Sequence, residues 1–207
     1  MKLYNQLERF REYCAKNPFE VEEIVPTENQ KFFRGELAVD RKRHLPGGES
    51  FVNIGYTLSG SRSKVLSNLF PYTFDFRGNE VASIEGVIQG LKIKDPEVQA
   101  MCWGYSGLNS SFLKAHADRD WAEEGILFWQ GEAIDRHSEE YTQFIEELYV
   151  SAAQNRLYEK ALLAMPSEKY LLHSIGKVDP HETSLTRGEF ETQLNQLRNF
   201  VKDDSEI

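Results

Sequence analysis

A single glutamate in an apolar neighbourhood is the strongest candidate for chemistry in this sequence. Glu85 follows Ser83, a residue type favoured as a helix N-cap, and therefore stands in the first turn of a predicted helix. Its neighbours along that helix are Ile84, Val87, Ile88 and Leu91. A carboxylate beside an apolar wall is desolvated, which can raise its pKa towards neutrality and suit it to general acid–base catalysis. Taken alone, the spacing favours a structural role, in which Glu85 only complements the positive end of the helix dipole.

A second candidate region combines aromatic and basic residues ahead of a helix. Residues 128–138 contain Trp129, Arg136 and His137. Trp129 can stack on a base or a ribose, although a single tryptophan more often belongs to the core. Arg136 offers a planar fork either to a phosphate or to a surface carboxylate. His137 has both a structural and a catalytic interpretation.

The third region is the polar loop of residues 173–183, which contains Lys177 and Asp179 and precedes the last predicted helix. Backbone N–H groups at a helix start can receive phosphate oxygens. Lys177, together with Lys92 at the end of the Glu85 helix, would supply cations for a diphosphate. Asn68 both donates and accepts hydrogen bonds, which suits it to ribose hydroxyl groups.

Periodicity and capping signals indicate the elements that must position these residues. Helices are predicted over 3–16, from Ser83 to about Lys94, from Ser138 along the apolar residues Tyr141, Phe144, Ile145, Leu148 and Ala152, and from the Thr186–Glu189 capping box to residue 202. Strand-like stretches lie at 31–34 and 50–56, and a hairpin is predicted to turn at Arg77–Gly78. We expect one α+β domain that is mostly helical, with a few short strands from residues 31–76. Residues 203–207 are expected to form a frayed tail.

Composition narrows the class of protein further. The chain has 207 residues, enough for one domain with its own core, and a formal charge of −9. This charge argues against an extended nucleic-acid-binding face but is compatible with a local basic pocket. The two cysteines form no disulfide framework, the chain start turns polar at once, and no apolar run has the roughly 20 residues that cross a bilayer. We therefore expect a soluble, cytoplasmic protein with no membrane partner.

Common catalytic motifs are absent from the sequence. Gly176–Lys177 lacks the upstream glycine and the following Ser or Thr of a phosphate-binding loop. His181–Glu182 is not followed by the second histidine of a zinc-protease helix, and there is no Gly-x-Ser-x-Gly nucleophile turn. The five histidines are scattered. We predict no metal site and no metal or redox cofactor.

In their order and spacing, these regions resemble the NADAR family, also called YbiA-like, whose members are linked to NAD and ADP-ribose metabolism. The resemblance runs through Leu66-Ser67-Asn68-Leu69-Phe70-Pro71, Ser83-Ile84-Glu85 with the later Gln89 and Lys92, Arg136-His137-Ser138, Ala161-Leu162-Leu163-Ala164 and the last helix to Arg198. It implies a YbiA-like domain over 56–202. Residues 1–55 lie outside the resemblance, and we expect them to form an N-terminal extension that packs on the core or covers the pocket entrance. The family's tryptophan falls near Arg136–His137, with Trp129 upstream, and its late aspartate falls between Lys177 and Asp179.

The resemblance implies an N-glycosidase that hydrolyses the bond between a ribose C1 and a nitrogen. The family's helix-borne glutamate falls on Glu85, which would orient a water as base or counter the charge of an oxocarbenium-like transition state. The expected substrate is an ADP-ribosylated guanine, so the expected partner is an ADP-ribose-containing small molecule or a modified nucleobase. The predicted substrate-binding residues are Asn68, Lys92, Trp129, Arg136, His137, Lys177 and Asp179.

Two other functions remain open at this stage. The family is also associated with hydrolysis of an early riboflavin-pathway N-glycoside. A non-catalytic module that binds ADP-ribose or NAD is the alternative from another class. Neutralising Glu85 separates these classes, because a binding module keeps its affinity whereas an enzyme loses turnover.

Overall fold

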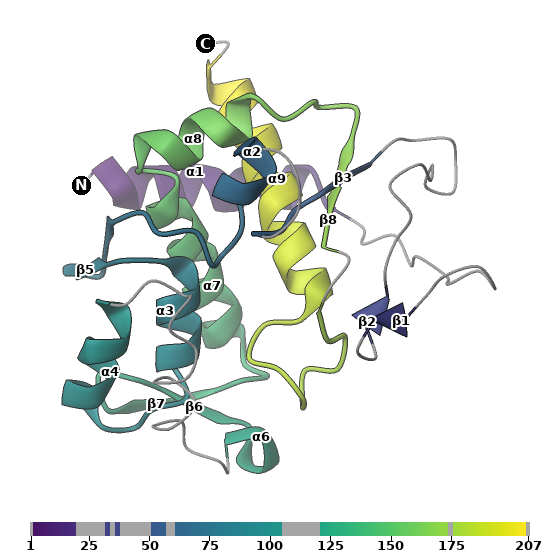
Figure 1. The fold of residues 1–207 in the computed structure, drawn as a ribbon. Coiled ribbons are helices and arrows are strands. Elements are labelled where there is room, and N and C mark those ends of the chain that lie inside the picture. The colour runs from purple at the N-terminus through teal and green to yellow at the C-terminus, as the bar shows by residue number, and fades with distance from the viewer. Residues whose placement is uncertain are drawn as a thin grey trace.

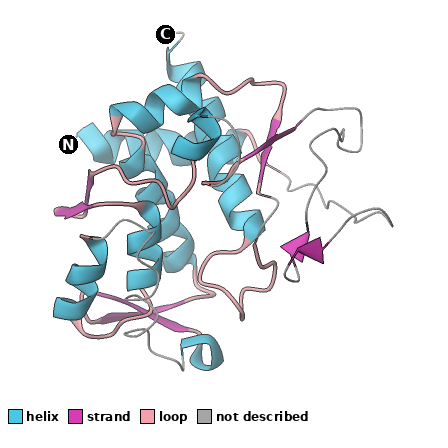
Figure 2. Cartoon of the chain, viewed as in Figure 1, coloured by secondary structure: helices cyan, strands magenta, loops and turns pink. Residues whose placement is uncertain are grey.

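The structure is mostly helical, and its strands occur in pairs (Figure 2). The computed structural model describes residues 2–19, 32–33, 36–37, 51–56, 61–104, 121–173 and 176–205. The helices in these ranges are α1 (Lys2–Lys16), α2 (Ser61–Val65), α3 (Ile84–Gly90), α4 (Pro96–Trp103), α6 (Trp121–Glu124), α7 (Glu139–Ala152), α8 (Arg156–Leu163) and α9 (Arg187–Ser205). The predicted α+β class, with helix predominating, is confirmed.

The strands form two-stranded sheets. Three described pairs are antiparallel: β1 (Phe32–Phe33) with β2 (Glu36–Leu37), β4 (Phe74–Phe76) with β5 (Asn79–Val81), and β6 (Ile126–Trp129) with β7 (Glu132–Asp135). The fourth pair is parallel and joins β3 (Phe51–Asn53) to β8 (Tyr170–Leu172), with Val52 opposite Leu171. Strands β5 to β8 lie outside residues 31–76, the range to which the sequence patterns had confined them.

The β4–β5 and β6–β7 hairpins share one turn chemistry. Arg77 and Gly78 have φ values of 52° and 77°, and Gln130 and Gly131 have values of 51° and 87°. Positive φ at both turn positions matches the twist of the flanking strands, and glycine at the second position avoids the strain of a Cβ atom. The first hairpin was predicted. The second was not, although its turn carries the same signal.

Helices α3, α7 and α9 begin at the predicted capping residues. The Oγ atoms of Ser83 and Ser138 each accept a hydrogen bond from a backbone N–H of the first turn, at 3.0 and 3.1 Å. At α9, Thr186 Oγ1 accepts from the Glu189 N–H at 3.2 Å, and Glu189 Oε2 accepts from the Thr186 N–H at 2.7 Å. This reciprocal pair is the capping box that the sequence predicted.

Helix α3 is shorter than predicted. It ends at Gly90 rather than near Lys94, because the Lys92 N–H bonds the carbonyl of Gln89, three residues back, and the chain turns there. Gly90 faces helix α4 at close range: a Cβ atom at this position would lie 3.0 Å from Trp103 Nε1. The glycine therefore lets α3 and α4 pack against each other.

Helix α7 lies at the centre of the core (Figure 1) and contacts α1, α3, α9, β4 and β7. Its predicted apolar stripe is buried throughout, at Tyr141, Phe144, Ile145, Leu148 and Ala152. The rings of Phe76 from β4 and Trp129 from β6 meet Phe144 edge to face, at centroid distances of 5.1 and 5.2 Å. Helix and hairpins thus share one aromatic core.

Helix α1 packs on α7 and α9 at one side of this core. The ring of Phe10 is fully buried and meets Phe200 of α9 edge-on at 5.5 Å. Helix α9 continues to Ser205, so residues 203–205 of the predicted frayed tail are helical, and an ion pair between Arg9 and Asp204 joins α1 to this last turn. None of the helices described here is long and apolar enough to cross a membrane.

Candidate functional site

A cavity of about 250 Å³ lies where α3, the end of β8 and the start of α9 meet. One wall is formed by the turn before α3 and by α3 itself, with Asn68, Glu85 and Gln89. The opposite lining comes from the chain after β8, with His173 and Lys177, and from residues 183–187 leading into α9. The cavity therefore joins two of the three regions that the sequence singled out.

Glu85 reaches the cavity wall from the first turn of α3. Its N–H donates to the Asn68 carbonyl at 3.0 Å, which fixes the start of the helix against the preceding turn. Its Oε1 accepts from Gln89 Nε2 at 2.8 Å, and Gln89 Oε1 accepts from Lys92 Nζ at 2.8 Å. The carboxylate, the amide and the ammonium group thus form a hydrogen-bonded row along one face of α3.

Burial sets the electrostatics of this row. It raises the pKa of Glu85, while the hydrogen bond from Gln89 and the charge of Lys92 oppose that rise. Burial also lowers the pKa of Lys92, which Glu85 opposes and Lys177 reinforces. Both shifts have desolvation as the largest cause, as expected where a charged form loses water. The result is a carboxyl group that titrates closer to neutrality, as a general acid or base requires.

Asn68 is held in place by the core. Its Oδ1 accepts from the Tyr149 hydroxyl at 2.9 Å, and burial raises the pKa of that tyrosine well above its usual value, so the hydroxyl stays a donor. With Oδ1 engaged, the NH₂ group is the part of Asn68 that can bind a substrate oxygen. Tyr149 comes from α7, so the central helix of the fold orients one residue of the cavity directly.

The chain after β8 shapes the opposite lining. The His173 N–H donates to Glu191 Oε1 at 2.7 Å, and its ring packs edge-on against Phe190 at 5.0 Å. His173 Nδ1 lies 2.7 Å from the Ile54 carbonyl. A carbonyl only accepts, so this nitrogen carries the proton. Gly176 has a φ of +146°, and a Cβ there would lie 3.3 Å from the His173 ring. Glycine therefore lets the backbone take this conformation close beside the imidazole.

Arg187 and Glu191 are cavity-side residues that the sequence reasoning missed. Arg187 is the first residue of α9, lines the cavity and is 14% exposed. Glu191 lies one turn later with 0% exposure, and the Arg187 Nε is 3.7 Å from its Oε1. Burial raises the pKa of Glu191, against hydrogen bonds from the His173 N–H and the Tyr170 hydroxyl and the charge of Arg187. Their spacing of four residues was the available signal, but an ordinary surface ion pair has the same spacing.

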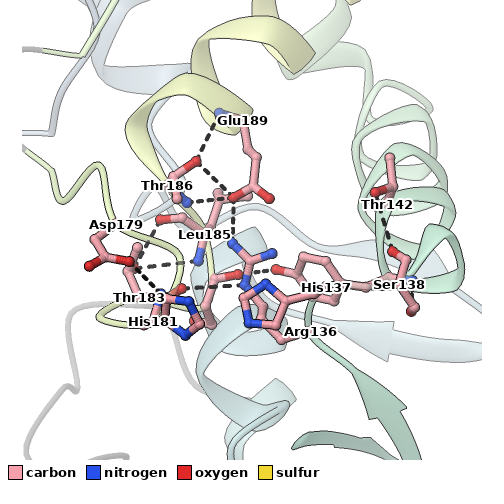
Figure 3. A network of polar contacts seen from close by, with 12 residues as sticks. Arg136, His137, Ser138, Thr142, Asp179, His181, Thr183, Leu185, Thr186 and Glu189 are labelled. Atoms are coloured by element: carbon pink, nitrogen blue, oxygen red, sulfur yellow. Dashed lines mark hydrogen bonds and ion pairs between the residues drawn. The ribbon is translucent and has the colours of Figure 1, made fainter. Parts of the chain in front are cut away.

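Arg136 does not line the cavity, contrary to its predicted role in phosphate binding. It is 3% exposed, and its Nη2 donates to Glu189 Oε2 at 2.6 Å (Figure 3). Its Nε donates to the Thr183 carbonyl at 3.3 Å, and its guanidinium lies 4.4 Å from the Tyr141 ring centroid. Arg136 thus ties the 183–186 segment, which does line the cavity, to the start of α9.

Sequence comparison with known proteins assigns the chain to a family. The sequence model of bacteriophage protein GP30.3 matches residues 60–199. The chain belongs to the GP30.3 family. It is 35% identical over 144 residues to an uncharacterized 17.1 kDa protein of the Gp30–rIII intergenic region of Enterobacteria phage T4, covering 67% of this chain and 91% of the phage T4 protein. No solved structure matches the chain.

The stretch matched to the GP30.3 family contains every predicted site residue, but not all of them meet at the cavity. Glu85, Asn68 and Lys177 line it, and Lys92 joins them through Gln89. Lys177 is 60% exposed and lies 3.5 Å from the Glu182 carboxylate. The ammonium group of Lys92 also lies 4.8 Å from the Trp121 ring centroid.

Trp129 belongs to the core of this GP30.3-family fold rather than to the cavity lining. It is 7% exposed and stacks on Trp103 at a centroid distance of 4.5 Å. The rings of Phe76 and Phe144 also pack against it in T-shaped arrangements. The ring therefore presents no open face on which a base or ribose could stack, which corrects its predicted role as a substrate platform.

His137 and Asp179 lie beside the Arg136 network (Figure 3) and outside the cavity lining. The rings of His137 and His181 are 4.7 Å apart, and Asp179 Oδ1 accepts from the His181 N–H at 2.9 Å. These contacts hold the loop before α9. Within the described residues, no group of three or more His, Cys, Asp or Glu side chains is arranged to hold a metal ion.

Proposed function

We propose that this GP30.3-family protein is an N-glycosidase that hydrolyses a ribose C1–N bond and releases ADP-ribose from an ADP-ribosylated guanine. The observation that carries the proposal is the Glu85 carboxyl group. It has a raised pKa and lines a cavity that also contains the cations Lys177 and Arg187. A titratable group perturbed by desolvation inside a cleft is a candidate for catalysis.

In the proposed reaction Glu85 first accepts a proton and then donates it. Breaking the C1–N bond passes through an oxocarbenium-like state, whose positive charge the Glu85 carboxylate opposes. Water attacks C1, the bonding electron pair leaves with the nitrogen, and Glu85 takes the proton of the water. The carboxyl group then passes this proton to the departing nitrogen. Glu85 is regenerated, and the products are a free sugar hydroxyl and an N–H group.

The resemblance to the NADAR family gains support from the hydrogen-bonded row on α3. Ser83 caps the helix, and the Glu85, Gln89 and Lys92 side chains of the family-like pattern are bonded in sequence. Side chains three and four residues apart share a helix face, so the pattern and the geometry agree. Gln89 orients the carboxylate, and Lys92 orients Gln89.

The volume of the cavity limits how much of a substrate it can enclose. Sites that enclose a drug-sized ligand have volumes of roughly 300–1,000 Å³. A cavity of about 250 Å³ accommodates the reacting ribose and its scissile bond, with the rest of an ADP-ribose outside. The same volume favours a second candidate substrate, the early riboflavin-pathway N-glycoside, because it is a smaller molecule.

Hydrolysis assays with the Glu85→Gln variant test the proposal. The panel contains an ADP-ribosylated guanine oligonucleotide, an ADP-ribosylated protein and the riboflavin-pathway N-glycoside. We expect Glu85→Gln to reduce turnover of the true substrate by about 10²–10⁴-fold, the contribution of a positioned acid or base. The matched control is Glu97→Gln, because Glu97 holds the same second position of α4 but is exposed. Near-native turnover by Glu85→Gln, or no turnover of any panel member by the natural protein, would refute the proposal. Retained ADP-ribose binding without turnover would identify a binding module instead.

A further inference from the structure

The cavity is lined by a largely buried cation, Arg187, whose only described ion pair is a long one to Glu191. Arg187 is 14% exposed, and among the described residues its Nε finds no hydrogen-bond acceptor. A guanidinium group carries five N–H donors in a fixed fork and stays charged at any relevant pH. Nε itself is covered, so the surface that Arg187 presents to the cavity belongs to the other atoms of its side chain, and a largely buried charged donor group in a cavity favours an acceptor supplied from outside the chain.

Glu191 forms an ion pair with Arg187 but accepts no hydrogen bond from its Nε. Its Oε1 accepts from the His173 N–H at 2.7 Å and its Oε2 from the Tyr170 hydroxyl at 2.9 Å. The Arg187 Nε lies 3.7 Å from Oε1, which is an ion pair but too long for a hydrogen bond. The carboxylate therefore positions the guanidinium and leaves donors for a ligand.

The other basic groups near the cavity are engaged differently. Arg136 donates to Glu189 and to the Thr183 carbonyl, as described above. Lys92 donates to Gln89, and Lys177 is 60% exposed beside Glu182. Arg187 combines burial with a place in the cavity lining, and it would bind a ligand through its side chain rather than through the start of α9, where the capping box engages the N–H groups of Thr186 and Glu189.

We infer that Arg187 binds the phosphate attached to the reacting ribose, so that the substrates are phosphorylated N-ribosides rather than free nucleosides. This rests on the proposed function, because the site is the same cavity as that of Glu85. A planar fork matches two phosphate oxygens with parallel hydrogen bonds, and the charge is worth more in a buried setting than in water. Lys177 at the rim adds to the positive field.

Binding measurements test this inference without requiring turnover. ADP-ribose, D-ribose 5-phosphate and D-ribose are titrated into the full chain and into Arg187→Gln. We expect Arg187→Gln to lose about 10- to 100-fold in affinity for the two phosphorylated probes, the range for charge-assisted hydrogen bonds, and to bind D-ribose as the natural protein does. Arg187→Lys keeps the charge without the fork, so it should recover part of the loss. Arg77→Gln is the matched control, since Arg77 also pairs with a glutamate, Glu147, but lies outside the cavity.

A second measurement uses the unaltered chain in case the variant fails to fold. The Arg187 Nε–Hε resonance should shift when D-ribose 5-phosphate is added and stay in place with D-ribose. An unshifted resonance, or equal affinity of the natural protein and Arg187→Gln for ADP-ribose, overturns the inference, as does an equal loss for D-ribose. Binding that depends on Arg187 without hydrolysis of any N-riboside rejects the N-glycosidase proposal and leaves the phosphate site standing.

Discussion

Neutralising Glu85 should stabilise the protein at neutral pH while it removes activity. Burial raises the pKa of this carboxyl group in the folded protein, so the folded state disfavours the charged form more than the unfolded chain does. Glu85→Gln removes that charge, and the amide oxygen still accepts the hydrogen bond from Gln89. The variant therefore keeps the local geometry without the buried charge.

The pH dependence follows from the direction of the shift. At low pH the carboxyl group is neutral in both states, and the variant and the natural protein should be equally stable. As pH rises through the ordinary glutamate value of 4.5, the unfolded chain ionises first, and the natural protein loses stability until the raised pKa is passed. The advantage of Glu85→Gln should thus grow from about pH 4 and level off above the raised pKa. We expect it to reach on the order of 1 kcal/mol, or about 2–4 °C in Tm for a chain of this size.

Glu97→Gln, at the same helix position, should change the stability in the opposite direction and destabilise the protein at neutral pH. Glu97 is the second residue of α4, after the N-cap Asp95 and Pro96, and is exposed. Losing its favourable interaction with the helix dipole should cost about 0.3–1 kcal/mol at neutral pH. The pair therefore compares a buried and an exposed glutamate at the same first-turn position, where both interact with the helix dipole.

Thermal unfolding of the natural protein and both variants, followed by circular dichroism from pH 3 to pH 8, measures these differences. Each variant is compared with the natural protein at the same pH. A lower Tm for Glu85→Gln at pH 7, or a difference that does not change between pH 3 and pH 7, would refute the reasoning. Either result would mean that Glu85 is stabilised by its partners rather than desolvated, and the case for catalysis would lose its physical basis.

Three further substitutions probe the fold around the site, each measured by urea unfolding at pH 7. Trp129→Ala should cost about 3–5 kcal/mol, because it empties a buried aromatic cluster; a cost below 1 kcal/mol would contradict the core assignment. Arg136→Gln should cost about 2–3 kcal/mol by breaking an ion pair whose arginine is buried, whereas Arg77→Gln, which breaks a pair whose arginine is 34% exposed, should cost less than about 1 kcal/mol; equal costs would show that burial of the arginine is not decisive. Gly90→Ala should destabilise by about 1 kcal/mol despite alanine's higher helix propensity, because its Cβ would press on Trp103; a stabilised variant would show that α4 can shift at little cost.

Local signals in the sequence were sufficient for much of the fold. Ser83, Ser138 and the Thr186–Glu189 pair cap helices as predicted, because capping depends on residues within one turn of each other. The position of Glu85 at the wall of a cavity was likewise predictable from its apolar neighbours on α3. The β6–β7 hairpin was not predicted, although Gln130–Gly131 has a glycine at the same turn position as Arg77–Gly78.

The remaining features depend on contacts between distant residues. Trp129 is a core residue because Trp103 and Phe144 surround it, and neither is close to it in sequence. Arg136 and Arg187 cannot be told apart by residue type. Only the fold shows that Glu189 engages the first, while the second lines the cavity. Which arginine can bind a ligand is thus decided by tertiary structure.

The parallel ladder between β3 and β8 has a consequence for any shortened form of this protein. Strand β3 precedes residue 60, where the family match begins, yet it borders β8 along its length, and the Ile54 carbonyl holds His173 in the cavity lining. A fragment cut at residue 60 would leave an unpaired sheet edge beside the cavity and release that imidazole. Because Ile54 and His173 are 119 residues apart, their contact closes a long loop, and the cavity should be completed late in folding.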